Sequence, residues 1–206
     1  MRKATLLILT LVTFCFCQAQ KRNSLYYGVS SDSLHSGHQL IFKTDSTLEI
    51  STFPRHMSQQ FKLTLNYIKK DNTIKLLRNS LSQKDSQSLV NHGLTEFLSE
   101  AAFTVDKRAI VDTASKMVYV LYKDFSKRVY LTYVIDGKTY KQETGLSDAY
   151  GIIKNKPKEN KALIEKLASI NNNLDNYTGS VYKGLDTYTK FGYDSVFGVI
   201  VLRRKD

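Results

Sequence analysis

The sequence has no tryptophan and little proline or cysteine. Its 206 residues include two prolines and two cysteines. Both cysteines, Cys15 and Cys17, lie near the start, so removal of that stretch would leave no thiol for a disulfide or a thiolate metal site. Such a chain must be stabilised by an ordinary hydrophobic core, and its length is sufficient for one domain or two small ones.

The first residues have the layout of a secretory signal peptide. The basic start MRK precedes the apolar stretch ATLLILTLVTFCF, and CQAQ then places the small residues Cys17 and Ala19 before a cut at Gln20. The apolar run is shorter than the about 20 residues of a membrane-spanning helix. We therefore expect residues 1–19 to be removed and the protein to be exported, either periplasmic or outer-membrane-associated. A lipoprotein is the less favoured alternative, because each cysteine follows a phenylalanine and not a small residue.

Acidic residues are fewer than basic ones, and the net charge is +11. The basic residues are scattered along the chain, whereas a nucleic-acid-binding surface needs them clustered on one face. We therefore expect no nucleic-acid partner. We interpret the charge as a solvated surface that can approach an anionic membrane or a polysaccharide.

Residues 24–82 have the pattern of an antiparallel β-meander. In FKLTLNY the apolar residues alternate strictly, which is typical of a strand with one buried face. Ser82 and Asp85 then form a helix-start signal before residues that recur at helical spacing. The expected N-terminal region, residues 20–128, is therefore a β-meander with one helix.

The clearest strand signal is KRVYLTYVIDGKTYKQ. Bulky apolar residues on both faces of 129–135 predict an interior strand, and Asp136-Gly137 predicts a two-residue hairpin turn. A helix with a narrow apolar stripe is expected at about 158–170.

Glycines divide the closing segment, VYKGLDTYTKFGYDSVFGVIVLRRK. Gly184 is expected to enter a short helix, and Gly192 to leave it in a left-handed conformation. Gly198 is expected to begin a buried strand containing Val199 and Ile200 and to leave room for the preceding helix. We assign these glycines to backbone geometry and not to a ligand.

Two motifs in this half resemble the plug-domain module of TonB-dependent outer-membrane receptors and related exported proteins. The resemblance covers about 129–206 and implies a small plug-like α+β module there; it does not cover 20–128. It does not imply transport, because no barrel sequence follows it. The matching positions are Tyr133 to Lys138 in YVIDGK, then Lys183, Gly184, Phe191, Gly192, Gly198, Val199 and Ile200.

Residues that carry chemistry are sparse. HSGH, with His35 and His38, has a metal-like spacing but no third ligand in sequence. Arg55 and His56 in FPRHM are a weak anion-site candidate. No G-x-S-x-G elbow, phosphate loop or H-E-x-x-H motif occurs. We therefore predict no catalytic residue, no metal site and no cofactor.

The sequence thus predicts an α+β protein with an N-terminal antiparallel β-meander and a C-terminal plug-like α+β module. Our hypothesis is an exported, non-catalytic envelope protein that acts as a binding or structural partner of another envelope protein. The alternative is a small envelope hydrolase or a half-barrel protein that binds an apolar ligand. A filled core with an exposed sheet edge favours the first, and a pocket with converging polar groups favours the second.

Overall fold

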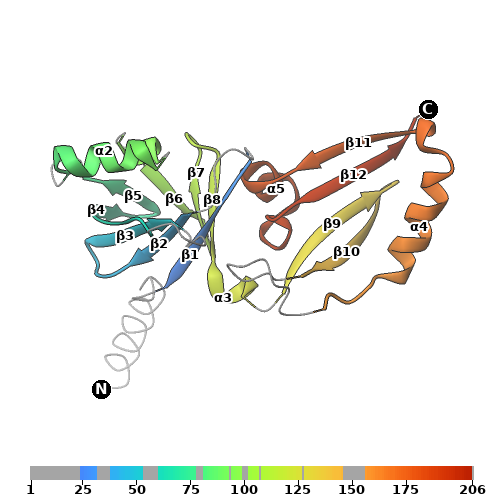
Figure 1. Ribbon diagram of the computed structural model, residues 1–206, viewed down its shortest axis with the longest axis horizontal. Helices are drawn as coiled ribbons and strands as arrows, with labels where there is room; N and C mark the ends of the chain where they lie inside the picture. Colours follow the sequence, from blue (N-terminus) through green and yellow to red (C-terminus); the bar gives the residue numbers. More distant parts are fainter. Residues whose placement is uncertain are drawn as a thin grey trace, which may run out of the picture.

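Two β-sheets make up most of the structure, a computed structural model (Figure 1). The structure describes residues 24–31, 38–52, 60–77, 81–92, 94–98, 102–106, 108–126, 128–145 and 156–205. The expected signal peptide lies outside these ranges. Within them, no helix has the length and apolar character required to cross a membrane.

The N-terminal sheet is a closed antiparallel barrel in which each strand pairs with its neighbours in sequence. Its strands are β1 (Leu25–Ser30), β2 (His38–Phe42), β3 (Thr47–Thr52), β4 (Lys62–Lys70), β5 (Thr73–Leu76), β6 (Ala102–Asp106), β7 (Ala109–Asp112) and β8 (Met117–Leu121). β1 closes the barrel because Tyr27 lies opposite Gln39 of β2 on one side and opposite Val120 of β8 on the other.

Side chains fill the barrel interior. Along β4, Leu65 and Tyr67 are buried while Thr64 and Asn66 are exposed, which is the alternation expected from the sequence. The capping box of Ser82 starts α2 (Gln83–Asn91), as predicted. Together with η2 (Thr95–Leu98), this helix adds apolar side chains to the barrel core. That core includes Leu40, Phe42, Leu48, Ile50, Leu65, Ile74, Leu89, Phe97, Phe103, Ile110, Met117 and Tyr119.

The predicted α+β class was wrong, and the sequence did not indicate that the N-terminal meander closes into a barrel. The described structure is mostly β, with a closed barrel followed by a second, mixed sheet. Alternation in a strand shows that one face is buried, but it does not show which strand its edge will meet. β8 pairs with β1, whose residues are far away in sequence, so no local sequence pattern predicts this pairing.

The second sheet has the order β10-β9-β12-β11. β12 pairs in parallel with β9, so the segments that the sequence predicts as an interior strand and a buried strand are the two central strands of one sheet. α4 covers one face of the sheet, and its Leu163 and Ile170 pack with Ile135 and Tyr140. The elements of this part are β9 (Val129–Ile135), β10 (Lys138–Thr144), α4 (Lys161–Asn171), η3 (Leu174–Asn176), β11 (Tyr177–Tyr182), α5 (Gly184–Phe191), η4 (Tyr193–Ser195) and β12 (Val199–Arg204).

Ile200 differs from its predicted burial. The neighbouring Val199 is fully buried and Val201 is 7% exposed, whereas Ile200 is only partly buried. Ile200 points to the same face as α4, and α4 packs mainly on the other end of that face, around Ile135. The residue therefore belongs to the margin of the core.

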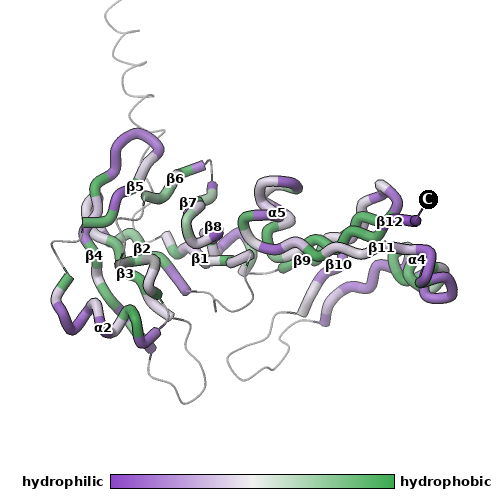
Figure 2. Tube along the Cα trace, turned by 90° about the horizontal axis from the view of Figure 1, so that it is seen from above, coloured by the Kyte–Doolittle hydropathy of each residue, from purple (hydrophilic) through white to green (hydrophobic). Residues whose placement is uncertain are grey.

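Helix α5 lies between the two sheets in both views of the chain (Figures 1 and 2). The outer faces of β1, β7 and β8 are apolar, and they pack against Leu185 and Val196. This explains why every residue of β7 is buried. The connection between the sheets includes the short helix α3 (Tyr122–Phe125), whose Phe125 joins the same cluster. The barrel therefore shares a hydrophobic cluster with α5 and with the segment that leads into β12, whereas the core between α4 and the second sheet is a separate cluster.

Candidate functional site

The two described histidines, His38 and His92, each contact an aromatic side chain. His38 is 1% exposed in the barrel core, where its Nε2 lies 2.7 Å from the Tyr119 hydroxyl. His92 stacks on Phe61, and its Nδ1 lies 2.8 Å from the Ser88 carbonyl oxygen. His35 and the anion-site candidates Arg55 and His56 lie outside the described residues. Among the side chains that the structure describes, no three of His, Cys, Asp or Glu are placed to hold a metal ion.

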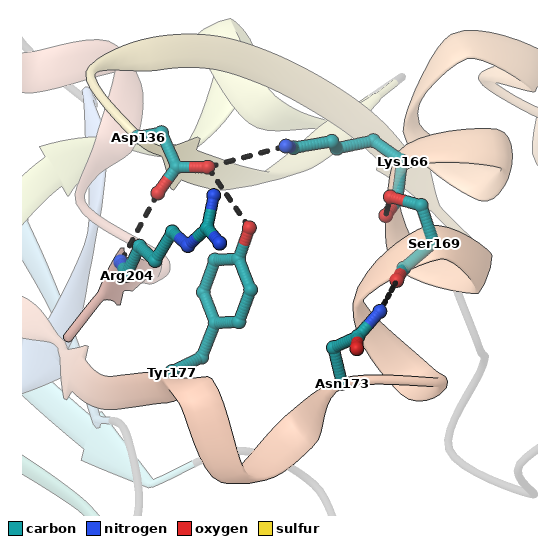
Figure 3. Close-up of polar contacts among 6 residues, drawn as sticks. All are labelled: Asp136, Lys166, Ser169, Asn173, Tyr177 and Arg204. Atoms are coloured by element: carbon teal, nitrogen blue, oxygen red, sulfur yellow. Dashed lines mark hydrogen bonds and ion pairs between the residues drawn. The ribbon is translucent and has the colours of Figure 1, made fainter.

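Asp136 of the YVIDGK motif ties three elements together (Figure 3). Its φ of 48° and the φ of 80° at Gly137 form the expected tight turn between β9 and β10. The carboxylate accepts hydrogen bonds from Lys166 Nζ at 3.1 Å, from the Tyr177 hydroxyl at 3.2 Å and from the Arg204 backbone N–H at 3.1 Å. The Lys166 bond in particular lowers the pKa of Asp136. Sequence reasoning found the turn but missed the role of the carboxylate.

The other motif glycines occupy constrained backbone positions. Gly192 follows α5 with a φ of 84° and a ψ of −179°, so the predicted positive φ is confirmed, but the residue is extended and not in the left-handed helical conformation that we predicted. At Gly198, an added Cβ would lie 2.8 Å from Leu131 Cδ1. The close neighbour is therefore strand β9, whereas the sequence predicts that it is the preceding helix. Gly184 has a φ of 54°, and an added Cβ there would meet the backbone of Ser30 and Ser31 in the barrel.

Ser31 completes the N-terminus of α5 from the other sheet. The residue before the helix, Lys183, provides no side-chain cap. Instead, the Ser31 hydroxyl donates to the Lys183 carbonyl oxygen at 3.0 Å and accepts from the Asp186 N–H at 3.2 Å. This is the capping interaction that usually comes from within the helix's own sequence. It explains why Gly184 must approach the barrel so closely.

A groove of about 670 Å³ runs between the outer side of the barrel and α5. Its lining residues are Thr104, Asp106, Arg108, Val111, Thr113, Leu185, Tyr188, Thr189, Gly192 and Tyr193. A second hollow of about 380 Å³ shares Arg108, Gly192 and Tyr193 with the groove, and it extends over Thr132 and Val134 of β9. Grooves between packed units are common binding places.

Tyr188, Tyr193 and Arg108 of the groove are held by polar contacts with the barrel and with the segment that follows it. The Tyr193 hydroxyl donates to Asp124 Oδ2 at 3.0 Å and accepts from the Leu121 N–H at 3.0 Å. The Arg108 guanidinium lies 4.4 Å above the Tyr193 ring and 3.5 Å from Asp124. The Tyr188 hydroxyl donates to Asp106 at 2.6 Å.

Both phenols of the groove remain protonated. Burial raises the pKa of Tyr188 and of Tyr193, and the neighbouring carboxylates add to this effect. A phenol held in this form donates hydrogen bonds, but it cannot serve as a base near neutral pH. The arrangement is therefore suited to fastening α5 to the barrel.

Strand β11 forms an open edge of the second sheet (Figure 1). The Lys205 N–H donates to the Asn176 carbonyl oxygen at 2.7 Å, and these two residues form the opposed pair next to Tyr177–Arg204 in the ladder, since Asn176 precedes Tyr177 and Lys205 follows Arg204. Because hydrogen-bonded and non-bonded pairs alternate in an antiparallel ladder, the backbone groups of Gly179 and Val181 point away from β12. No described residue bonds to them. We call this outward side of the strand the β11 edge.

The opposite edge strand of the same sheet, β10, is covered by side-chain hydrogen bonds and carries charged residues. The side-chain amide of Asn160 donates to the Lys141 carbonyl oxygen at 3.1 Å, and Gln142 Nε2 donates to the Lys158 carbonyl oxygen at 2.8 Å. Lys138 and Lys141 also place charges on this strand. The β11 sequence YTGSVY has neither a charge nor a proline, the two devices that commonly protect exposed edges. Among the described strands of the two sheets, β11 is the edge strand that lacks these protective features.

Comparisons with protein-family models, with curated proteins and with solved structures find no match for this chain. Its function must therefore be inferred from the geometry of the described residues.

Proposed function

We propose that this protein is an exported, non-catalytic binding protein of the cell envelope that holds a protein partner by strand addition at the β11 edge. The observation that carries the proposal is the outward-facing backbone of Gly179 and Val181, which an extended segment can pair with. Export rests on the signal-peptide layout of residues 1–19.

The packed barrel core supports this function over the apolar-ligand alternative. Its interior positions are occupied by large side chains, among them Phe42, Phe97, Phe103 and Tyr119, each of them almost fully buried. A half-barrel for an apolar ligand would instead keep an open interior. The protonated phenols and paired charges of the groove likewise give no support to a hydrolase.

We further propose that residues 129–206 are a plug-like module. The order of elements agrees with the sequence resemblance, because β11 ends at Tyr182 before Lys183-Gly184, α5 ends at Phe191 before Gly192, and β12 follows Gly198. The short helix and the final strand thus lie where the motif requires them. Transport is not part of the proposal.

Photo-crosslinking in the source organism tests the binding function. A photoreactive phenylalanine analogue is placed at Ser180, which is exposed on β11, and the matched control carries it at Thr64, which is exposed on the barrel. We expect an adduct with one protein from Ser180 and none from Thr64. N-terminal sequencing of the same product is expected to begin near Gln20. A folded, exported protein that gives no adduct from Ser180 would contradict the proposed function.

A further inference from the structure

The two faces that border the β11 edge differ in chemistry. On the face that also carries α4, Val181 is 68% exposed and Gly179 has no side chain. On the opposite face, Tyr182 lies beside the exposed Lys190 and Thr178 lies opposite the exposed Arg203. Side chains on one strand alternate between these faces, so an added strand would meet both environments in turn.

The apolar face offers room for large side chains. A Cβ added at Gly179 would lie 3.4 Å from Leu202 Cδ2, so the apolar Leu202 side chain lies directly beside this gap. An apolar residue opposite Gly179 on an added strand can therefore reach Leu202, and one opposite Val181 can cover that exposed side chain. Cross-strand apolar pairs of this kind stabilise sheets by about 0.2–1 kcal/mol each.

The opposite face carries two cations without a carboxylate partner among the described residues. Lys190 Nζ lies 4.2 Å above the Tyr182 ring. Arg203 lies opposite Thr178 in the β11–β12 ladder, and it is exposed. Thr178 and Tyr182 are four positions apart on the same face of the strand. The two cations therefore lie beside the two ends of the β11 edge.

From these observations, and resting on the proposed function, we propose that the partner segment is an extended strand with the pattern acidic–apolar–any–apolar–acidic. Its acidic residues face Arg203 and Lys190, and its apolar residues face Gly179 and Val181. The pattern reads the same in both directions, so it fits a parallel or an antiparallel strand. Opposite charge fixes the register and the choice of partner.

Peptide binding to the whole mature protein tests this inference. The probe is a fluorescein-labelled peptide, SGELTVEGS, and its matched control, SGKLTVKGS, differs only in charge; binding is followed by fluorescence anisotropy. We expect the glutamate peptide to bind about tenfold more tightly than the lysine peptide, and this preference to weaken with added salt. The double variant Lys190→Glu and Arg203→Glu is expected to reverse the preference.

Val181→Pro separates the inference from the proposed function. The Val181 N–H points outward, so proline removes a group that an added strand needs while leaving the β12 ladder intact. Loss of binding in this variant, with an unchanged melting temperature, is expected.

The other outcomes separate the two proposals. If both peptides bind equally and Val181→Pro abolishes that binding, the acidic pattern is overturned but strand addition is retained. Binding of neither peptide, or binding that survives Val181→Pro, would overturn both. A wild-type dimer that Val181→Pro dissociates would assign the edge to a second copy and would also overturn the inference.

Discussion

Replacement of Gly184 by alanine tests whether the two sheets are joined by a close backbone contact. Gly184 has a φ of 54°, and an alanine Cβ would lie 2.5 Å from the Ser31 backbone nitrogen. Backbone cannot move aside as the end of a flexible side chain can. We expect α5 to shift away from β1 and to lose the two hydrogen bonds of the Ser31 hydroxyl.

The expected loss of stability has two parts. The positive φ costs about 1 kcal/mol for alanine. The two hydrogen bonds contribute about 1 kcal/mol each, which brings the total to about 3 kcal/mol. For a chain of this size, that corresponds to a fall in melting temperature of about 6–12 °C.

Gly137→Ala is the matched control. Gly137 also has a positive φ, 80°, but no atom lies within 4 Å of an added Cβ. We expect a loss of only about 1 kcal/mol, which is the backbone part alone. Thermal unfolding followed by circular dichroism compares the two variants.

A double-mutant cycle with Ser31→Ala examines the cause. If Gly184→Ala acts by separating α5 from Ser31, the double variant is expected to be about as stable as Gly184→Ala alone. Additive losses, or equal losses in the Gly184 and Gly137 variants, would refute the reasoning.

Two further predictions concern the second sheet. The pKa of Asp136 is lowered in the folded protein, so its contribution to stability is present above the usual aspartate pKa of about 3.9 and is lost as the pH falls through the folded value. Asp136→Asn is therefore expected to lower the melting temperature at pH 7 and to make less difference at pH 3; an equal difference at both pH values would contradict this. Val199→Asp is expected to unfold the protein, since a buried unpaired charge costs several kcal/mol, whereas Ile200→Asp at the core margin is expected to cost less. Urea denaturation ranks the two variants, and the reverse order would show that the assignment of core and margin is wrong.

Short-range features of the fold were predictable from sequence because neighbouring residues determine them. The capping box of Ser82 and the tight turn at Asp136-Gly137 each depend on a few adjacent side chains. The positive φ of Gly192 follows from the need to leave a helix within one residue. The alternation of buried and exposed residues in β4 was also predictable, because successive side chains of a strand point to opposite faces.

Long-range features could not be predicted in this way. The closure of the barrel joins β1 to β8, and the cap of α5 joins Ser31 to Asp186. The carboxylate of Asp136 meets Lys166 and Tyr177 only after α4 and β11 have packed. The exposure of Ile200 has the same origin, because it depends on which end of the sheet α4 covers. Each of these features depends on a tertiary contact between distant residues, which the sequence around either residue does not predict.

The two sheets differ in whether they have free edge strands, and this difference is relevant to the proposed strand addition. The barrel has no free edge, because β1 and β8 pair with each other, and α5 is fastened to its outer side through Ser31. α5 directly follows β11, so the barrel fixes one end of the open strand, and the hydrogen bond between Asn176 and Lys205 fixes the other. A strand held at both ends loses little further freedom when a partner segment pairs with it. Under the proposed function, we infer that the barrel holds the β11 edge in place for a partner segment.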